Sequence, residues 1–163
     1  MSYPQPRYAG ETGEVSATFR RADEPAELPY HSGNAVHYLA TGATTAGRFG
    51  LYRWDFSPKP SGPGAHFHRT ISESFFILSG TVRLYDGKEW VDATAGDFSY
   101  VPEGGIHAFR NESGQEASML ILFAPGAPRE EYFETIGQLA AGAAAMNDAE
   151  RAEFYLRHDN IWV

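Results

Sequence analysis

Cysteine is absent from this sequence of 163 residues. Without thiol groups the chain can form no disulfide bond, no thiolate zinc site and no iron–sulfur cluster held by protein ligands. Any metal ion in this protein must therefore be bound by histidine and carboxylate side chains.

Positive charge is scarce as well. The chain has 13 Lys and Arg residues against 21 Asp and Glu residues, a formal net charge of -8, and no long block of consecutive basic residues. Such a surface offers little that would neutralise a row of phosphates or hold the chain to an anionic membrane. We therefore expect no nucleic acid and no membrane among its partners.

Long apolar runs are also missing. The longest, Met119 to Ala127, is far shorter than the ~18 residues typical of a membrane span, and Pro125 and Gly126 interrupt it. The first residues, MSYPQPRYAGETGEV, lack the basic start and the apolar stretch of a secretory signal. These features predict a cytoplasmic protein.

The length and composition of the chain suit one globular domain, because 163 residues with 42% hydrophobic residues can bury a sizeable core. Three regions differ in composition. Residues 1–34 are rich in Pro, Gly and charge and predict an extended N-terminal arm. Residues 35–124 consist of short alternating segments separated by glycine and predict a β-barrel, and residues 125–163 predict a helical extension packed on it.

Alternation within residues 35–124 indicates particular strands. Tyr52, Trp54 and Phe56 share one face of a strand, because side chains two residues apart point to the same side. Asp86-Gly87, between Thr81–Tyr85 and Lys88–Val91, favours a tight hairpin turn.

The strand over Met119–Phe123 is apolar on both faces, so we expect both of its faces to be covered, by a second sheet or by another subunit. A symmetric dimer is the commonest way to cover such a surface, and the extended arm also needs a surface to pack against. The sequence therefore predicts a homodimer.

Two helices are expected in the C-terminal extension. Pro128 suits a first helical turn, and Tyr132 and Ile136 follow at the spacing of one helix face. A second helix should begin near Asn147, whose side chain can form a capping box with Glu150.

The residues with the clearest chemistry are histidines. His66 and His68 are two residues apart and would point from one face of a strand, and Glu73 follows five residues later. His107 lies further along the chain in Gly104-Gly105-Ile106-His107. Three imidazole nitrogens and one carboxylate oxygen suit a divalent transition metal, although a His-x-His pair in a loop also arises by chance.

These residues resemble the two motifs of the cupin superfamily. The first motif runs as a glycine region, His66, His68, Glu73 and then Gly80, with Pro60 standing where the motif usually opens with glycine. The second motif is complete; its residues are Gly96, Pro102, Gly104, His107 and Asn111. Fifteen residues separate Gly80 from Gly96, as is typical of small cupins.

The resemblance implies an all-β fold, the cupin jelly-roll barrel or double-stranded β-helix, with one divalent metal per chain. The metal ligands that it implies are His66, His68, Glu73 and His107. Fe, Mn, Ni, Co and Zn are all compatible with this ligand set. Residues that share a strand face with the ligands, or come from a neighbouring strand, predict an aromatic substrate pocket; they are Tyr52, Trp54, Phe56, Phe75, Ile77 and Phe109. Such side chains also commonly fill the interior of a small barrel without forming a pocket.

A finer resemblance, to single-domain quercetinase-like cupins, rests on Gly62–His68, on the surroundings of Pro102 and on the sequence from Pro128 to Glu134. It implies a metal-dependent dioxygenase that uses dioxygen to cleave an aromatic or enolic, flavonol-like small molecule, with Glu73 as the catalytic base. Two alternatives stay open. One is a metal-dependent lyase, isomerase or cyclase. The other is a protein that binds a small ligand without catalysis.

Overall fold

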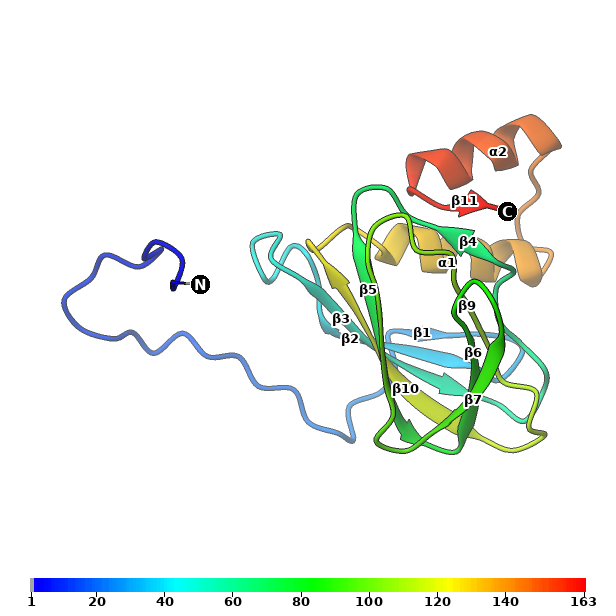
Figure 1. The fold of residues 1–163 in the computed structure, drawn as a ribbon, viewed down its shortest axis with the longest axis horizontal. Helices are drawn as coiled ribbons and strands as arrows, with labels where there is room; N and C mark the ends of the chain where they lie inside the picture. The colour runs from blue at the N-terminus through cyan, green and yellow to red at the C-terminus, as the bar shows by residue number, and fades with distance from the viewer. Residues whose placement is uncertain (1) are drawn as a thin grey trace.

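The computed structural model describes residues 2–163 and consists mainly of two antiparallel β-sheets that form a barrel (Figure 1). The larger sheet has six strands in the order β1-β2-β3-β10-β5-β8. Its strands are β1 (Leu28–Pro29), β2 (Ala35–Ala40), β3 (Gly50–Phe56), β5 (Ser72–Ser79), β8 (Phe98–Val101) and β10 (Ala117–Ala124). Strands far apart in the sequence, such as β3 and β10, are neighbours, as in a jelly roll.

The smaller sheet has three strands in the order β7-β6-β9. Its strands are β6 (Thr81–Tyr85), β7 (Trp90–Thr94) and β9 (Ala108–Arg110). The predicted hairpin between β6 and β7 is confirmed, but its second strand begins at Trp90 and not at Lys88. Gly87 has a φ of 92°, and Asp86 Oδ1 accepts hydrogen bonds from the backbone N–H groups of Lys88 and Glu89, which belong to the turn. A separate pair joins β4 (His66–Phe67) to β11 (Ile161–Trp162), close to the C-terminus.

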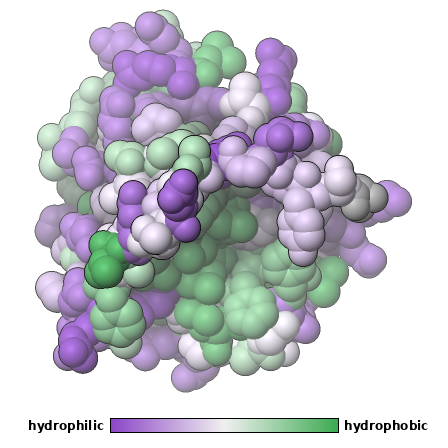
Figure 2. Space-filling view, turned by 90° about the vertical axis from the view of Figure 1, so that its left-hand side faces the viewer, coloured by the Kyte–Doolittle hydropathy of each residue, from purple (hydrophilic) through white to green (hydrophobic). Residues whose placement is uncertain are grey.

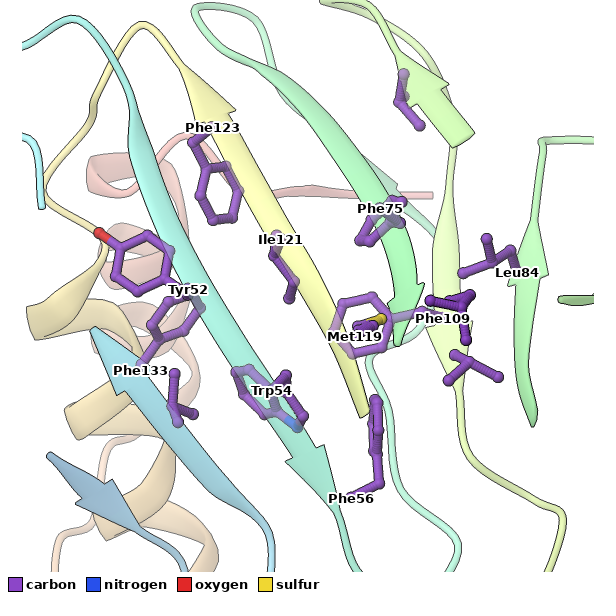
Figure 3. Close-up of a cluster of buried hydrophobic side chains, with 14 of the residues drawn as sticks. Tyr52, Trp54, Phe56, Phe75, Leu84, Phe109, Met119, Ile121, Phe123 and Phe133 are labelled. Carbon is purple, nitrogen blue, oxygen red and sulfur yellow. The ribbon is translucent and has the colours of Figure 1, made fainter. Parts of the chain in front are cut away.

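The core lies between the two sheets and is rich in aromatic rings (Figure 3). Strand β3 contributes Tyr52, Trp54 and Phe56, and β10 contributes Met119, Ile121 and Phe123, because alternate residues of each strand face inward. The rings of Trp54 and Phe109 meet edge to face, with centroids 6.0 Å apart. The period of two seen in the sequence therefore identifies the inner faces of these strands.

The other face of β10 is only partly covered within one chain. Leu120 and Leu122 are half-buried, whereas the inward residues Met119 and Ile121 are almost completely buried. The core thus covers the inner face of β10, as predicted. The outer face of β10 forms part of the outward surface of the six-stranded sheet and is not fully covered within one chain.

Two helices follow the barrel. Helix α1 (Glu130–Ala140) packs against the barrel and buries Tyr132 and Phe133. Helix α2 (Asp148–Arg157) lies beside β11 at the end of the barrel that carries β4, and it buries Phe154 (Figure 1). The predicted all-β jelly roll with C-terminal helices is confirmed.

The start of α2 follows the sequence prediction closely. The Asn147 side chain accepts a hydrogen bond from the Glu150 backbone N–H, and the Glu150 carboxylate accepts one from the Asn147 backbone N–H. This reciprocal capping box satisfies two backbone donors that a helix start otherwise leaves free.

The N-terminal segment runs away from the barrel as an extended arm until β1, which lies within the first 34 residues and pairs with β2 (Figure 1). Figure 2 views the molecule from the side on which the arm projects, and hydrophobic residues gather on the surface behind the arm. Within residues 2–163, neither helix has the length and apolar character needed to cross a membrane.

Candidate metal centre

The four candidate ligands come together at one end of the barrel, from three parts of the chain. His66 lies on β4, His68 follows that strand, Glu73 lies on β5, and His107 directly precedes β9. The backbones of His66 and His107 face each other and exchange two N–H···O hydrogen bonds of 3.0 and 2.9 Å. The ligand atoms of all four side chains lie within 4.8 Å of one another, and every side chain is buried.

Backbone carbonyls fix the orientation of all three imidazole rings. His66 Nδ1 lies 3.0 Å from the Gly64 carbonyl oxygen, and His107 Nδ1 lies 2.9 Å from that of Gly105. His68 Nδ1 contacts the carbonyl oxygen of Asp159. Because a carbonyl only accepts, each Nδ1 must carry the hydrogen. The Nε2 lone pair of every ring is therefore the one available to a metal ion.

The carboxylate completes the cluster. Glu73 Oε2 lies 2.8 Å from His107 Nε2 and 3.1 Å from His68 Nε2. Burial alone would raise the pKa of Glu73, but the hydrogen bonds with His107 and His68 outweigh it and hold the pKa well below its ordinary value. Glu73 is thus ionised at neutral pH.

Lone pairs on Nε2 and on a carboxylate oxygen repel each other unless a proton or a cation lies between them. Burial opposes the charged form of His107, but its hydrogen bond to Glu73 raises the pKa of His107 and so favours a proton at this position. Three neutral imidazole nitrogens and one carboxylate oxygen also form a set that suits a divalent transition metal. The residues present therefore fit the metal ion that the sequence motifs imply.

Gly62 explains why glycine occurs two residues later than the first motif requires. It has a φ of 147°, and a Cβ atom built there would overlap the carbonyl oxygen of Phe109. Only glycine allows this close approach of two backbones next to the ligand-bearing strand.

Asn111, the last residue of the second motif, does not belong to the metal cluster. It is fully buried, and its amide donates hydrogen bonds to the carbonyl oxygens of Ser57 and Gln115. It satisfies backbone groups near a strand end.

The C-terminal segment contributes to the centre in a way that the sequence did not indicate. The Asp159 carboxylate accepts hydrogen bonds from the backbone N–H groups of Arg69 and Thr70, and so anchors the segment beside His68. Trp162 pairs with His66 across β11 and β4, and the two rings are 5.2 Å apart. No spacing in the sequence links positions 159–162 with the histidines, because the contact depends on where α2 ends.

A cavity of about 580 Å³ adjoins the cluster, and His66 and Glu73 are part of its lining. Trp54, Phe56 and Phe109, three of the six predicted pocket residues, also line it. The other three, Tyr52, Phe75 and Ile77, are buried in the core and do not line the cavity. Strand parity predicted that all six face inward, but it carries no information about their depth along the barrel.

Several cavity residues were missed at the sequence level because they come from the C-terminal extension or from the segment before β2. They include Tyr30, Arg129, Tyr132, Tyr155, Asn160 and Trp162. The barrel mouth is therefore closed in part by α1 and by the segment around β11.

The fold and the site together define a class: a double-sheet jelly roll whose buried cluster of three histidines and one glutamate can hold one metal ion. Residues 52–123 match the family model described as the cupin domain. This match identifies a cupin domain over residues 52–123 of the chain.

Comparison with individual proteins gives more distant similarities. Quercetin 2,3-dioxygenase of Bacillus subtilis is 27% identical over 107 residues, which are 65% of this chain but only 31% of that protein's length. The polyketide cyclase RemF of Streptomyces resistomycificus aligns with a TM-score of 0.54 and 22% identity, over 66% of this chain and 78% of that one. A predicted oxalate decarboxylase of Thermotoga maritima aligns with a TM-score of 0.53 and 22% identity, over 56% and 80%. The structural likeness shows the fold and leaves the reaction open.

Proposed function

We propose that this protein is a metal-dependent dioxygenase that cleaves an aromatic or enolic, flavonol-like small molecule with dioxygen. The observation that carries the proposal is the aromatic cavity of about 580 Å³ whose lining includes His66 and Glu73. A site of this size can enclose a small organic ligand. The partial similarity to quercetin 2,3-dioxygenase favours this reaction over others of the fold.

One divalent transition metal per chain, Fe, Mn, Ni, Co or Zn, would be held by the cluster of His66, His68, Glu73 and His107. When bound, such an ion acidifies a substrate hydroxyl and supplies the Lewis-acid or redox chemistry of the reaction. The three Nδ1–carbonyl contacts keep the histidine rings in place for it.

Glu73 would act as the base that takes the proton from the substrate hydroxyl. Its Oε2 is engaged by His68 and His107, whereas its Oε1 accepts no hydrogen bond from residues 2–163. The carboxylate is ionised at neutral pH and lies in the cavity wall. The substrate O–H bond would break, with the proton passing to Oε1 and the electron pair remaining on the substrate oxygen.

The aromatic walls would position the substrate ring and exclude water. Phe109 lies edge to face with both Trp54 and Phe56, with ring centroids 6.0 Å apart in each pair. A planar aromatic substrate can stack on or meet the edges of these rings, each contact adding ~1 kcal/mol beyond the buried area. Replacing Phe109 should therefore weaken substrate binding more than metal binding.

The decisive experiment measures oxygen consumption by protein reconstituted with each candidate metal, using a panel of flavonols and enediols. We expect uptake of dioxygen with at least one member of the panel. Glu73→Gln should retain part of the metal and lose more of the turnover, with Glu153→Gln, an exposed carboxylate on α2, as the matched control.

Other outcomes would identify the two alternative functions. No oxygen consumption with any metal and any substrate of the panel would remove the dioxygenase proposal. Turnover under anaerobic conditions would instead indicate a lyase, isomerase or cyclase. Tight binding of a small molecule, with no product detected by mass spectrometry, would indicate a binding protein.

A further inference from the structure

Arg129 carries a buried positive charge next to the cavity. Its side chain is 3% exposed, it directly precedes α1, and it lines the cavity. Burial lowers the pKa of the guanidinium, but an arginine remains charged in a folded protein. No acidic side chain of residues 2–163 forms an ion pair with it. A buried charge without a counter-ion is costly, so the protein keeps this arginine at the expense of stability.

The contacts that Arg129 does make leave part of its binding capacity unused. Nη1 donates to the carbonyl oxygen of His158 at 2.7 Å, and Nη2 donates to Asn160 Oδ1 at 3.0 Å. The rings of Tyr132 and Phe123 lie 4.2 and 5.0 Å from the guanidinium carbon. These contacts anchor the C-terminal segment, but none of them supplies a negative charge.

Three buried nitrogen donors of residues that line the cavity have no hydrogen-bond partner. They belong to Arg129 (Nε), Asn160 (Nδ2) and Trp54 (Nε1), all of which line the cavity. The orientation of the Asn160 amide is fixed, because Arg129 only donates and must face Oδ1. All three groups are donors, and buried donors without acceptors are rare in folded proteins.

The charges of the residues that line the cavity also favour an acceptor group on the ligand. Glu73 is the one acidic residue among the described side chains that line it, and its charge is already engaged by His68 and His107. Glu73 and Asp159 attract the positive charge of Arg129 only from a distance, because neither forms an ion pair with it. An anionic group on a ligand would supply both the missing charge and the missing acceptors.

We infer that Arg129 and Asn160 bind a carboxylate group of the substrate, so that the substrate is an aromatic or enolic acid. Arg129 Nε and Asn160 Nδ2 both lack an acceptor, and the hydrogen bond between the two side chains joins these donor nitrogens in one cluster, which matches the two oxygens of a carboxylate. The inference rests on the proposed function in taking this cavity as the substrate site.

The test compares two ligands of nearly the same shape, the anion 3-hydroxy-2-naphthoate and its neutral amide, 3-hydroxy-2-naphthamide. Binding is measured by isothermal titration calorimetry in chelator-treated protein, so that the metal does not contribute to the preference, and then in zinc-loaded protein. We expect the wild type to bind the carboxylate at least about tenfold more tightly than the amide in both forms.

Asn160→Asp is the sharpest variant, because it is isosteric and places a carboxylate on Arg129 from within the chain. It should abolish the preference for the acid over the amide. Arg129→Gln should abolish the preference as well. Arg157→Gln removes an equal charge from an exposed ion pair with Glu131 and should leave the preference unchanged.

Equal affinity of the wild type for the two ligands, or binding of neither, would overturn the inference. Survival of the preference in both Asn160→Asp and Arg129→Gln, each shown to be folded by circular dichroism, would overturn it too. Oxygen consumption is recorded separately. A carboxylate preference without oxygen uptake would retain the subsite and remove the dioxygenase function, and oxygen uptake without the preference would do the reverse.

Discussion

Two histidines of the metal cluster, His66 and His107, differ in how tightly they hold a proton, although both are buried. Burial lowers the pKa of His66 to about 4, because a charged imidazole is poorly solvated there. For His107 the hydrogen bond to Glu73 outweighs burial and raises the pKa. A metal ion therefore competes with a proton more at His107 than at His66, which is already neutral at physiological pH.

The lowered pKa of His66 predicts a pH dependence of stability. The unfolded chain takes up a proton on His66 near pH 6.5, whereas the metal-free folded chain resists it down to about pH 4. Between these values the unfolded state binds more protons, so the free energy of unfolding falls as the pH falls. We expect the metal-free wild type to lose about 2 kcal/mol more than His66→Gln between pH 7 and pH 5. Urea unfolding at both pH values measures this, and parallel losses would contradict it.

Replacing the ligands themselves should separate metal binding from proton transfer. His66→Ala, His68→Ala or His107→Ala should each remove the metal and the activity together, with the metal content of the purified protein falling at least about tenfold. His37→Ala is the matched control, because His37 is buried but bonds to Asp55 and Arg53 outside the cluster. Elemental analysis gives the result. If one of these variants kept its full metal content and full activity, the replaced histidine would not be a metal ligand.

Among the secondary-structure elements, β11 and the turn before it have the clearest link to the metal centre. The segment is short, but it contacts two ligands: Asp159 bonds to His68 through its carbonyl oxygen, and Trp162 pairs with His66. The position of this segment is set by where α2 ends. It is also held by Arg129, at the start of α1, which donates a hydrogen bond to the carbonyl oxygen of His158. The extension thus orients ligands that lie about 90 residues earlier in the chain.

Removing residues 158–163 should weaken metal binding without unfolding the barrel. The truncation takes away the acceptor that fixes the His68 ring, and loss of such an outer partner typically costs 10- to 100-fold in metal affinity. Competition with a chelator measures the affinity. Removal of residues 2–20, from the projecting arm, is the control and should leave the affinity unchanged. An unchanged affinity in the C-terminal truncation would show that β11 does not support the site.

For the whole molecule, we expect the barrel to stay folded when the metal ion is removed. The core has aromatic and aliphatic side chains from many strands and does not depend on the four ligands. Chelation should abolish activity, lower the melting temperature only moderately through loss of a bound ligand, and preserve the β signal in far-UV circular dichroism. Collapse of that signal would mean that the metal is structural.

The outward face of the six-stranded sheet and the arm predict association with a second copy of the chain. Large hydrophobic residues of β5 and β8 are exposed there, among them Phe76 at 40%, Phe98 at 64% and Tyr100 at 59%. On the arm, Tyr3 and Phe19 are exposed at 98% and 85%. Hydrophobic surface of this kind usually marks an interface. We expect a homodimer, with the Phe98→Glu, Tyr100→Glu double variant monomeric and folded.

Light scattering coupled to size-exclusion chromatography measures the association. A mass equal to one chain of 18.0 kDa at micromolar concentration would contradict the dimer. A cytoplasmic location stays a prediction from the composition and the apolar runs of the sequence.

Features that depend on neighbouring residues followed from the sequence. The capping box of Asn147 and Glu150, the Asp86-Gly87 turn and the inward faces of β3 and β10 each depend on a spacing of one to four residues, which the backbone converts directly into geometry. The four candidate ligands were found because their motifs encode the strand positions that bring them together.

Only the tertiary structure decided which aromatic residues line the cavity and what else surrounds it. Tyr52 and Trp54 share a strand face, yet only Trp54 reaches the cavity, because depth along the barrel depends on how the sheets pack. Arg129, Asp159 and Asn160 reach the site from helices and turns whose placement depends on burial of the α1 and α2 faces against the barrel. Sequence spacing determined the local geometry and the ligand set, whereas long-range packing determined the shape and charge of the cavity, because contacts between distant segments have no fixed spacing along the chain.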